Sequence, residues 1–530
     1  MNTPSRLPGL RQGLRQGLRH RWFRLGRGVQ TLLLAGLVLA VAVILLVLVD
    51  RLTDDSCAPG VVERDGECVG VTDGSFVFSP HLERVSARIE RENDEVRASG
   101  QEYVTVALMI PMTLSGEVGR EQILKEVQGA FLAQYRANHQ DNDAGPLIRL
   151  VLANPGRDSA HWERVTEQLI GMAADDSDRL RAVTGFNISQ RPAGDILTRL
   201  TGAGVPVVAG PLTADNLGNT AEDPEAFPGM VKIVPDNGDQ AAALASFQQA
   251  AEGEGDGEPL LVYDARAGDH YNSTLYEIFG GELAGAAAYE PMKFTSSGIT
   301  DTTGVAAQFR LMIPRICNLP DTVNTLYFAG RPTHLRQFVN ELGEQPCRRF
   351  TVISASGAST LATDTELNWD VLGKGITVRY SALAHPDAWP ATADPVGGEH
   401  DAMETLKTLA AEHAARIGTT DLEDSRAIVM YDAVWTAVEG IRLAAAAGAV
   451  AVPSAAEVAA VWAQMSQGYG VSGASGWICL NNHGNAHNKA VAVVSLDPDN
   501  PGRLRFDGLA WPQGAPPGTD CTIPNRAAAS

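Results

Sequence analysis

Residues 180–213 read LRAVTGFNISQRPAGDILTRLTGAGVPVVAGPLT and carry a strong local signal for the fold. Leu180 to Phe186 is a short, mostly apolar run, and Val205 to Ala209 is a second one. Between them, Ala193 to Leu200 has the apolar spacing of a helix that turns one face to a core. A strand, a helix and a second strand in this order predict a βαβ unit with parallel strands.

The same alternation continues on both sides of this stretch. Upstream, strands are expected at Tyr103–Ile110 and Leu147–Ala153, with helices from Gly119 onward and over Trp162–Ala174. Downstream, further strands are expected at Pro259–Asp264, Ala288–Phe294, Asn324–Ala329, Phe350–Ser354, Ala490–Leu496 and Leu504–Leu509, and helices at Leu335–Leu342 and Arg426–Ala447. Parallel strands that alternate with helices are covered on both faces, so the sequence predicts an α/β protein.

The chain is too long for one compact domain, because it has 530 residues and domains typically hold roughly 100–200. Two sets of βαβ units predict two Rossmann-like lobes with a hinged cleft between them. Ligands bind beyond the carboxyl ends of strands in such sheets, and clefts between domains are favoured sites. The expected boundaries are 101–235 and 381–472 for lobe 1, 236–380 and 473–510 for lobe 2, and 511–530 for a Pro/Gly-rich tail.

The amino terminus predicts a single transmembrane helix. Thr31 to Val49 reads TLLLAGLVLAVAVILLVLV, and residues 28–49 contain no charged side chain. A helix of about 20 apolar residues crosses a bilayer. The run exceeds the usual apolar region of a secretory signal and no small-residue cleavage site follows it, which favours a retained signal anchor at 29–49. A long signal peptide that is cleaved at an unusual site is the alternative.

Charge gives the expected orientation of this anchor. Residues 1–28 contain seven arginines and no acidic residue, whereas the whole chain has a net charge of −21. Basic residues stay on the cytoplasmic side, so we expect residues 1–28 in the cytoplasm and the bulk outside the cell membrane. The acidic bulk also argues against a nucleic-acid partner. With 36 arginines and six lysines, the composition is typical of a GC-rich bacterial source.

All six cysteines follow the predicted anchor, and an even number outside the cytoplasm favours disulfides. Fifteen pairings are possible for six cysteines. Pairing neighbours in sequence gives Cys57–Cys68, Cys317–Cys347 and Cys479–Cys521. Residues 50–100 are then expected to form a stapled stalk and a helix that begins at Ser79-Pro80, with Ser79 as its cap.

Several segments, in this order, resemble type I periplasmic binding proteins of the branched-chain amino-acid (leucine/isoleucine/valine) ABC-transporter class. The resemblance covers roughly residues 103–495. Its segments are Ala107–Gly116, Ala182–Ser189, Val205–Thr213, Leu261–Tyr271, Leu326–Gly330, Ala427–Ala433 and Val471–Trp477 with Asn481–Asn485. The resemblance implies two lobes that close around a small ligand without chemistry, and no cofactor.

The resemblance also implies ligand-binding residues. Ser189 and Thr213 match a serine and a threonine that bind the ligand, and hydroxyls at strand-to-helix junctions suit a carboxylate. Thr113 and Ser115 follow the first strand, and Tyr271 would pack on the ligand from the second lobe. The alternatives are ordinary helix caps for the hydroxyls and a half-exposed surface residue for the tyrosine.

Two departures from the family pattern put an α-amino acid ligand in doubt. Family members that bind amino acids place a tyrosine after the strand matching 326–330 and an acid after the strand matching 350–354. Here Arg331 and the run Ser354–Gly357 stand there, and the next carboxylate is Asp364. An unpaired buried ammonium group is costly, so the missing acid matters.

Enzyme and metal signals are weak. There is no Gly-x4-Gly-Lys-Ser/Thr phosphate loop and no Gly-x-Ser-x-Gly elbow. His483 and His487 are four residues apart, but Gly484 and the neighbouring asparagines indicate a turn, so no metal site is expected. The sequence therefore predicts a membrane-anchored extracytoplasmic solute-binding protein for an ABC-type importer; the alternative is a sensing or scaffold ectodomain of the same fold.

Overall fold

The structure is a computed structural model, and it describes residues 31, 36 and 56–518 except 115, 141–144, 253–256, 346, 348, 392–397 and 466–468. The chain divides into two units, Met1–Cys57 and Ala58–Ser530. In the first unit, Thr31 and Gly36 are helical. Among the described residues, no helix has the length and hydropathy needed to cross a bilayer. The tail and anchor predicted over 1–49 lie almost wholly outside the described residues and stay predictions.

The first sheet of the second unit has the strand order β2-β3-β5-β4-β6-β7-β8. The strands from β5 to β8 are parallel, as the βαβ pattern predicts, and β3 joins antiparallel beside β5. The bounds are β2 (Val61–Arg64), β3 (Glu67–Thr72), β4 (Tyr103–Met109), β5 (Leu147–Asn154), β6 (Leu180–Gly185), β7 (Val207–Ala209) and β8 (Met230–Lys232), with β1 (Ser56–Ala58) at the junction of the two units.

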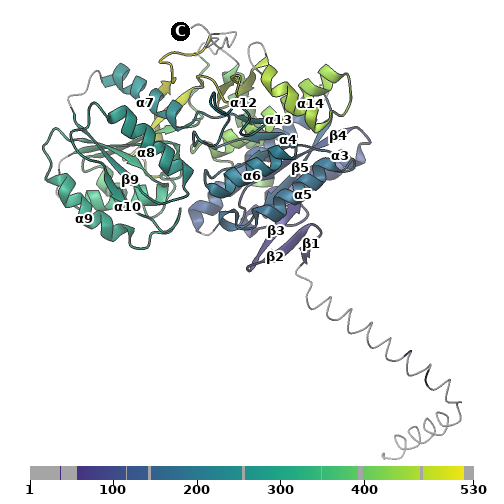
Figure 1. Cartoon of the computed structure of the whole chain (residues 1–530), viewed down its shortest axis with the longest axis horizontal. Coiled ribbons are helices and arrows are strands. Elements are labelled where there is room, and N and C mark those ends of the chain that lie inside the picture. Colours follow the sequence, from purple (N-terminus) through teal and green to yellow (C-terminus); the bar gives the residue numbers. More distant parts are fainter. Residues whose placement is uncertain are drawn as a thin grey trace, which may run out of the picture. The chain divides into compact units, whose positions relative to one another are not determined.

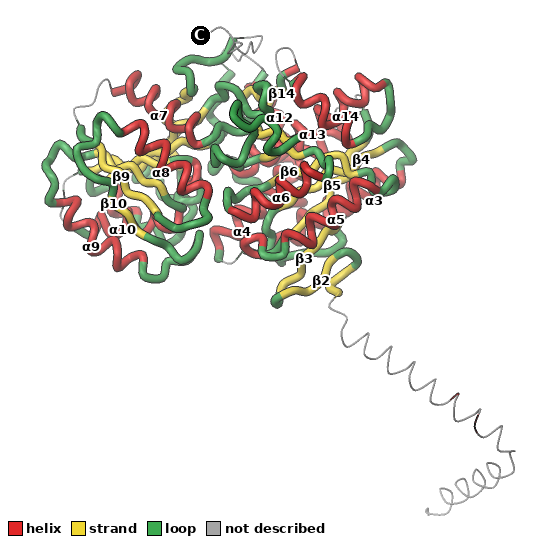
Figure 2. Tube along the Cα trace, viewed as in Figure 1, coloured by secondary structure: helices red, strands yellow, loops and turns green. Residues whose placement is uncertain are grey.

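Helices cover both faces of this sheet (Figure 2). One face packs against α5 (Trp162–Ala174) and α6 (Arg191–Gly202), whose apolar residues form a core with the strands. The other face carries α3 (Glu83–Ala98), α4 (Glu117–His139), α13 (Arg426–Gly448) and α14 (Ala455–Val461), with α12 (Glu399–Ile417) packed on α3 and α4.

The second sheet has the order β10-β9-β11-β12-β13-β16-β17. Its first five strands are parallel, and β16 and β17 add an antiparallel edge. The bounds are β9 (Pro259–Asp264), β10 (Met292–Phe294), β11 (Thr325–Ala329), β12 (Phe350–Ser354), β13 (Ile376–Ala382), β16 (Val491–Leu496) and β17 (Leu504–Ala510). Figure 1 shows β9 with α8, α9 and α10 grouped apart from the elements around β4 and β5.

Helices again lie on both faces of the second sheet. One face carries α7 (Asn237–Glu252) and α8 (His270–Leu283). The other face carries α9 (Val305–Cys317), α10 (Pro332–Gly343) and the short α11 (Trp369–Leu372) over a large apolar core. Each sheet with its helices is one lobe of the second unit.

The chain passes between the lobes three times. It leaves the first lobe after β8, returns after β13, and leaves again after the hairpin of β14 (Val471–Gly473) and β15 (Gly476–Ile478), which lies against α12 and α13. The lobe boundaries predicted from the sequence stay predictions. Three connections between two compact bodies form the hinge about which such lobes turn.

Two sequence-based expectations for residues 50–100 were wrong. The segment expected to be a stalk contributes β2 and β3, and β3 pairs with β5 of the first sheet. Asp65 and Gly66 have φ of 51° and 81°, which is the backbone of a tight hairpin turn. Ser79 precedes the 3-10 turn η1 (Pro80–Leu82), but its hydroxyl accepts no capping hydrogen bond from the backbone of this turn and instead bonds His81 Nδ1 at 2.9 Å.

The described cysteines are all disulfide-bonded. Cys317 and Cys347 form the predicted pair, which joins the end of α9 to the segment after α10. Cys57, Cys68 and Cys479 are also disulfide-bonded. The pairings predicted for these three stay predictions, and Cys521 lies outside the described residues.

Removing the Cys317–Cys347 bridge should weaken the second lobe. The bridge closes a loop with a sequence separation of 30, and a loop of this length corresponds to about 3 kcal/mol of lost unfolded-state entropy. We expect Cys317→Ser/Cys347→Ser to lower the urea midpoint accordingly. A double variant with an unchanged midpoint would show that the bridge does not stabilise the lobe.

A second stability prediction concerns the close packing of α4 on α13. A Cβ at Gly129 would lie 2.2 Å from the Ala427 carbonyl oxygen, and this backbone cannot move aside. Gly129→Ala should therefore cost about 1–3 kcal/mol in the free energy of unfolding. Gly171→Ala in α5 is the matched control, because a Cβ there meets nothing within 4 Å. That control should gain about 0.5–1 kcal/mol; equal effects of the two changes would refute the packing argument.

Candidate ligand-binding site

The carboxyl ends of the parallel strands of both lobes lead to one cleft. Ser189 follows β6 and Thr213 follows β7 in the first lobe. Arg331 follows β11 and Gly357 follows β12 in the second lobe, while Tyr271 stands in the first turn of α8. This is where an open α/β sheet is expected to bind its ligand.

A small pocket of about 30 Å³ lies at the bottom of this cleft. Three of the residues predicted from the sequence, Ser189, Thr213 and Tyr271, line it. Two arginines, Arg331 and Arg426, line it as well, and no carboxylate does. The pocket is thus lined by basic and hydroxyl groups, and it is about the size of one water molecule or one small charged group.

A larger cavity of about 450 Å³ adjoins the small pocket. The two share four lining residues, Asn187, Arg331, Gly357 and Arg426. The volume falls in the range of small-molecule sites, which is about 300–1,000 Å³. The wall is mixed, with apolar side chains such as Leu114 alongside threonines from the second lobe.

Arg331 joins the two lobes. Its Nε and Nη2 donate to the Asp269 carboxylate at 2.9 and 2.6 Å, and Nη2 also donates to the Ser189 carbonyl oxygen at 3.1 Å. Its guanidinium lies 4.8 Å from the centre of the Tyr271 ring. Burial alone would raise the pKa of Asp269, but Arg331 and then Arg266 hold that pKa below its ordinary value.

Arg426 makes the reciprocal connection from the first lobe. It begins α13, donates from Nη1 to Glu126 at 3.2 Å, and donates from Nε and Nη2 to the Ser359 hydroxyl of the second lobe at 3.2 and 3.1 Å. Burial raises the pKa of the Glu126 carboxyl although Arg426 opposes the shift. Asn187 also donates to Glu126, at 2.6 Å, so this acid holds two cleft residues in place.

Tyr271 is 2% exposed, so the alternative of a half-exposed surface tyrosine does not hold. Its backbone amide donates to the Ser189 carbonyl oxygen at 3.3 Å. Its hydroxyl accepts a hydrogen bond from the Gly357 amide at 2.9 Å, and burial raises the pKa of this hydroxyl to about 12. A Cβ at Gly357 would lie 2.5 Å from that hydroxyl, so glycine is needed for this approach.

The other predicted hydroxyls divide into two groups. Ser189 and Thr213 are each 3% exposed and line the small pocket, where Ser189 Oγ accepts from the Ala214 amide at 3.4 Å. Thr113 lines neither cavity, because its hydroxyl donates to Glu67 of β3. Ser115 lies outside the described residues.

Asp364, the first carboxylate in the sequence after the strand β12, lines the larger cavity. It is paired with Arg336, whose Nε lies 3.4 Å from its Oδ2. Burial raises the pKa of Asp364 even though Arg336 opposes the shift. Asp269 and Asp364 are therefore both committed to arginines of this chain. Neither is positioned as a free partner for a ligand's ammonium group.

Sequence reasoning did not assign Arg331 and Arg426 to the cleft. Arg331 was noted only because it stands where family members have a tyrosine, and Arg426 only as the start of a helix. Their partners lie 62 and 300 residues away in the sequence. A usable signal was the arginine directly after the strand β11, at a carboxyl end where ligands bind.

The crossing from β8 to α7 carries a cluster of charges directly behind Thr213. Lys232 is 1% exposed, donates to the Ala214 carbonyl oxygen at 3.2 Å and lies 4.0 Å from Asp236. Burial first, and then Asp236, raise the pKa of Asp215 to about 6 and that of Asp239 to about 7, with Lys232 opposing both shifts. We therefore expect the connection between the lobes to respond to pH.

The sequence matches no protein-family model and no curated protein. The structure, in contrast, resembles solved substrate-binding proteins. The branched-chain amino acid transporter substrate-binding protein LivJ of Streptococcus pneumoniae, in complex with isoleucine, matches with a TM-score of 0.55 at 14% identity, over 77% of this chain and 100% of that chain. The leucine-binding protein LivK of Thermotoga maritima matches with a TM-score of 0.53 at 17% identity, over 78% of this chain and 100% of that chain.

This chain has the type I periplasmic binding-protein fold. A third match agrees: a solute-binding protein of an ABC transporter from Rhodopseudomonas palustris, in complex with p-hydroxybenzoic acid, has a TM-score of 0.55 at 12% identity, over 77% of this chain and 97% of that chain. The fold expected from the resemblance in the sequence is therefore confirmed. At these identities the likeness establishes the fold and leaves the ligand to be argued from the cleft itself.

The charge cluster at the crossing gives a pH prediction. An acid whose pKa is raised in the folded state lowers stability as pH rises from its unfolded value, near 4, through its folded value, near 7. Asp239→Asn removes this effect. It should raise the free energy of unfolding by about 1 kcal/mol at pH 8 and leave it unchanged near pH 4.

Thermal melts of the full chain between pH 4 and pH 8 measure the effect. Asp195→Asn on α6 is the control, because Asp195 is exposed and is not a member of the cluster. A variant curve that runs parallel to the wild-type curve would contradict the assignment of Asp239 to this pH dependence.

Proposed function

We propose that this chain is a membrane-anchored extracytoplasmic solute-binding protein that captures a small carboxylate between its lobes for an ABC-type importer. The observation that carries the proposal is the small pocket, which is lined by two arginines, by no acid and by six hydroxyl-bearing residues (Ser189, Thr213, Tyr271, Ser356, Ser359 and Ser425). The solved structures of the same fold support a binding role without chemistry, since they are binding proteins of ABC transporters.

The two connected cavities suggest how the ligand is held. The small pocket has room for one carboxylate group, which Ser189, Thr213 and the guanidinium groups of Arg331 and Arg426 would surround. Charge-assisted hydrogen bonds of this kind are stronger than neutral ones. The rest of the ligand would occupy the cavity of about 450 Å³.

The acids bound to arginines around the small pocket favour a carboxylate that places no ammonium group there, whereas Glu117, Asp158 and Glu366 line the larger cavity. Asp269 and Asp364 are bound by arginines of this chain, and Glu126 is bound by Arg426. An α-amino acid would bring a buried ammonium without a free acid to receive it in the small pocket. A hydroxybenzoate, the class of ligand present in one of the similar structures, meets this constraint.

The anchor predicted at 29–49 favours a second function, which is ligand sensing. A transporter component more often diffuses freely or carries a lipid, whereas a retained helix suits an ectodomain that senses the same ligand. Loss of ligand uptake on deletion of the gene supports transport. Unchanged uptake with an altered transcriptional response to the ligand supports sensing.

Ligand binding can be tested with paired variants of the full chain in mild detergent. Thr213→Val and Ser189→Ala each remove one hydroxyl from the small pocket with little change of shape. For the tightest carboxylate in a panel of 4-hydroxybenzoate, 3,4-dihydroxybenzoate, leucine and isoleucine, each should raise Kd about tenfold, which corresponds to about 1.4 kcal/mol.

Thr113→Val is the matched control for this titration, because Thr113 lies outside both cavities. It should leave Kd unchanged. Binding of leucine or isoleucine in preference to both benzoates would contradict the proposed ligand class. An equal effect of Thr113→Val and Thr213→Val on Kd would contradict the location of the site.

A further inference from the structure

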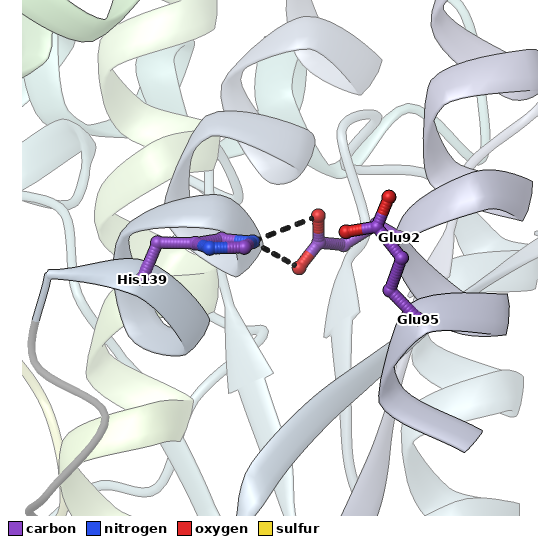
Figure 3. A group of neighbouring side chains, drawn as sticks. All are labelled: Glu92, Glu95 and His139. Atoms are coloured by element: carbon purple, nitrogen blue, oxygen red, sulfur yellow. Dashed lines mark hydrogen bonds and ion pairs between the residues drawn. The ribbon is translucent and has the colours of Figure 1, made fainter. Parts of the chain in front are cut away.

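A cluster of three potential metal ligands lies in the first lobe, outside the cleft. Glu92 and Glu95 stand one turn apart on α3, and His139 is the last residue of α4 (Figure 3). One ligand atom from each lies within 4.8 Å of the others. The described part of the chain contains no other group of this kind.

Glu92 is the unusual member of the cluster. It is 1% exposed, and both its carboxylate oxygens face the same nitrogen, His139 Nε2, at 2.9 and 3.1 Å (Figure 3). Its Oε1 also accepts from Asn138 Nδ2 at 2.9 Å. No lysine or arginine among the described residues forms an ion pair with it. Burial of a carboxylate is costly unless a cation, such as a basic side chain or a metal ion, pairs with it.

Neighbouring basic side chains do not supply that cation. Arg88, one turn before Glu92 on α3, lies 5.9 Å from the centre of the Phe131 ring and forms no ion pair with Glu92. Arg91 is exposed and has no ion pair in the described chain. Lysines and arginines of the described chain therefore do not pair with Glu92, and the geometry leaves His139 and a bound ion as its partners.

The third residue favours a bound ion. Glu95 is exposed, and its carboxylate has no hydrogen-bond or ion-pair partner in the part of the chain that the structure describes. Figure 3 shows its carboxylate beside that of Glu92. Two carboxylates side by side repel one another unless a cation lies between them. An ion pair between His139 and Glu92 alone would not explain why the Glu95 carboxylate lies beside that of Glu92.

The geometry suits a metal that accepts both nitrogen and oxygen. The His139 ring stacks on Tyr135 with a centroid distance of 4.2 Å, which fixes the plane of the imidazole and the direction of Nε2. Zinc binds imidazole nitrogen and carboxylate oxygen at roughly 2.0–2.2 Å. Calcium and magnesium prefer ligand sets made of oxygen alone. Only Glu95, the exposed side chain, needs to move for the three atoms to reach one ion.

We propose that Glu92, Glu95 and His139 bind a divalent transition-metal ion, with Zn²⁺ the best match, and that this ion fastens the end of α4 to α3. Water would fill the remaining coordination position, because Glu95 and His139 are exposed. The site is independent of the ligand cleft. The sequence predicts no metal site. It carries no sign of this one, because Glu95 and His139 lie 44 residues apart on two different helices.

The test uses the tag-free full chain after treatment with a chelator. Zn²⁺ is titrated into it, and calorimetry measures the binding while thermal melts measure the melting temperature. We expect one equivalent of Zn²⁺ to bind and to raise the melting temperature. Glu95→Gln should raise the Kd for Zn²⁺ at least tenfold while preserving the bond between Glu92 and His139. Glu90→Gln, on the same helix and outside the cluster, is the control and should bind Zn²⁺ as the wild type does.

Three results would overturn the proposal. The first is the absence of Zn²⁺ binding at micromolar concentration, which would leave an ion pair between Glu92 and His139. The second is equal affinity of the Glu95→Gln variant and the wild type. The third is tighter binding of Ca²⁺ or Mg²⁺ than of Zn²⁺ in parallel titrations, which would indicate a different kind of site.

Discussion

The ion pair between Arg331 and Asp269 organises the cleft. Asp269 is 1% exposed and caps α8 by accepting a hydrogen bond from the Asn272 amide at 3.2 Å. Its pairing with Arg331 places the guanidinium against the Tyr271 ring and the Ser189 carbonyl oxygen. Loss of Arg331 would leave the buried carboxylate with Arg266 as its remaining charge partner and would remove its link to the first lobe. This one ion pair thus supports the start of α8, the lining of the small pocket and the contact between the lobes.

The charge of the cleft is opposite to that of the chain as a whole. The net charge is −21, yet the small pocket is lined by two arginines and no acid. Each arginine is held by a buried carboxylate outside that pocket, Asp269 for Arg331 and Glu126 for Arg426. The acids therefore fix the arginines without entering the pocket. This arrangement explains why an acidic protein would select an anion.

Much of the fold could be predicted from local sequence patterns. Strands β9 and β12 and helix α5 have the bounds that their apolar spacing predicts, because their signals lie within each segment. The hairpin of β2 and β3 was missed, although Asp65-Gly66 between valine-containing runs is a typical hairpin signal. The region was interpreted as a stapled stalk because of its two cysteines, and the turn signal at Asp65-Gly66 was overlooked.

The site was less predictable than the fold. The sequence places Ser189, Thr213 and Tyr271 at the cleft because each follows a strand or begins a helix in a recognisable segment, and all three line the small pocket. Their role in ligand binding stays a prediction. Arg426 was not predicted at the cleft, because its partner Glu126 is distant in sequence and only the packing of α4 on α13 brings them together. The most direct test of the account compares the Kd of the tightest-binding carboxylate with that of its primary amide. The account predicts at least tenfold weaker binding of the neutral amide, and equal affinity would contradict an anion-selective pocket.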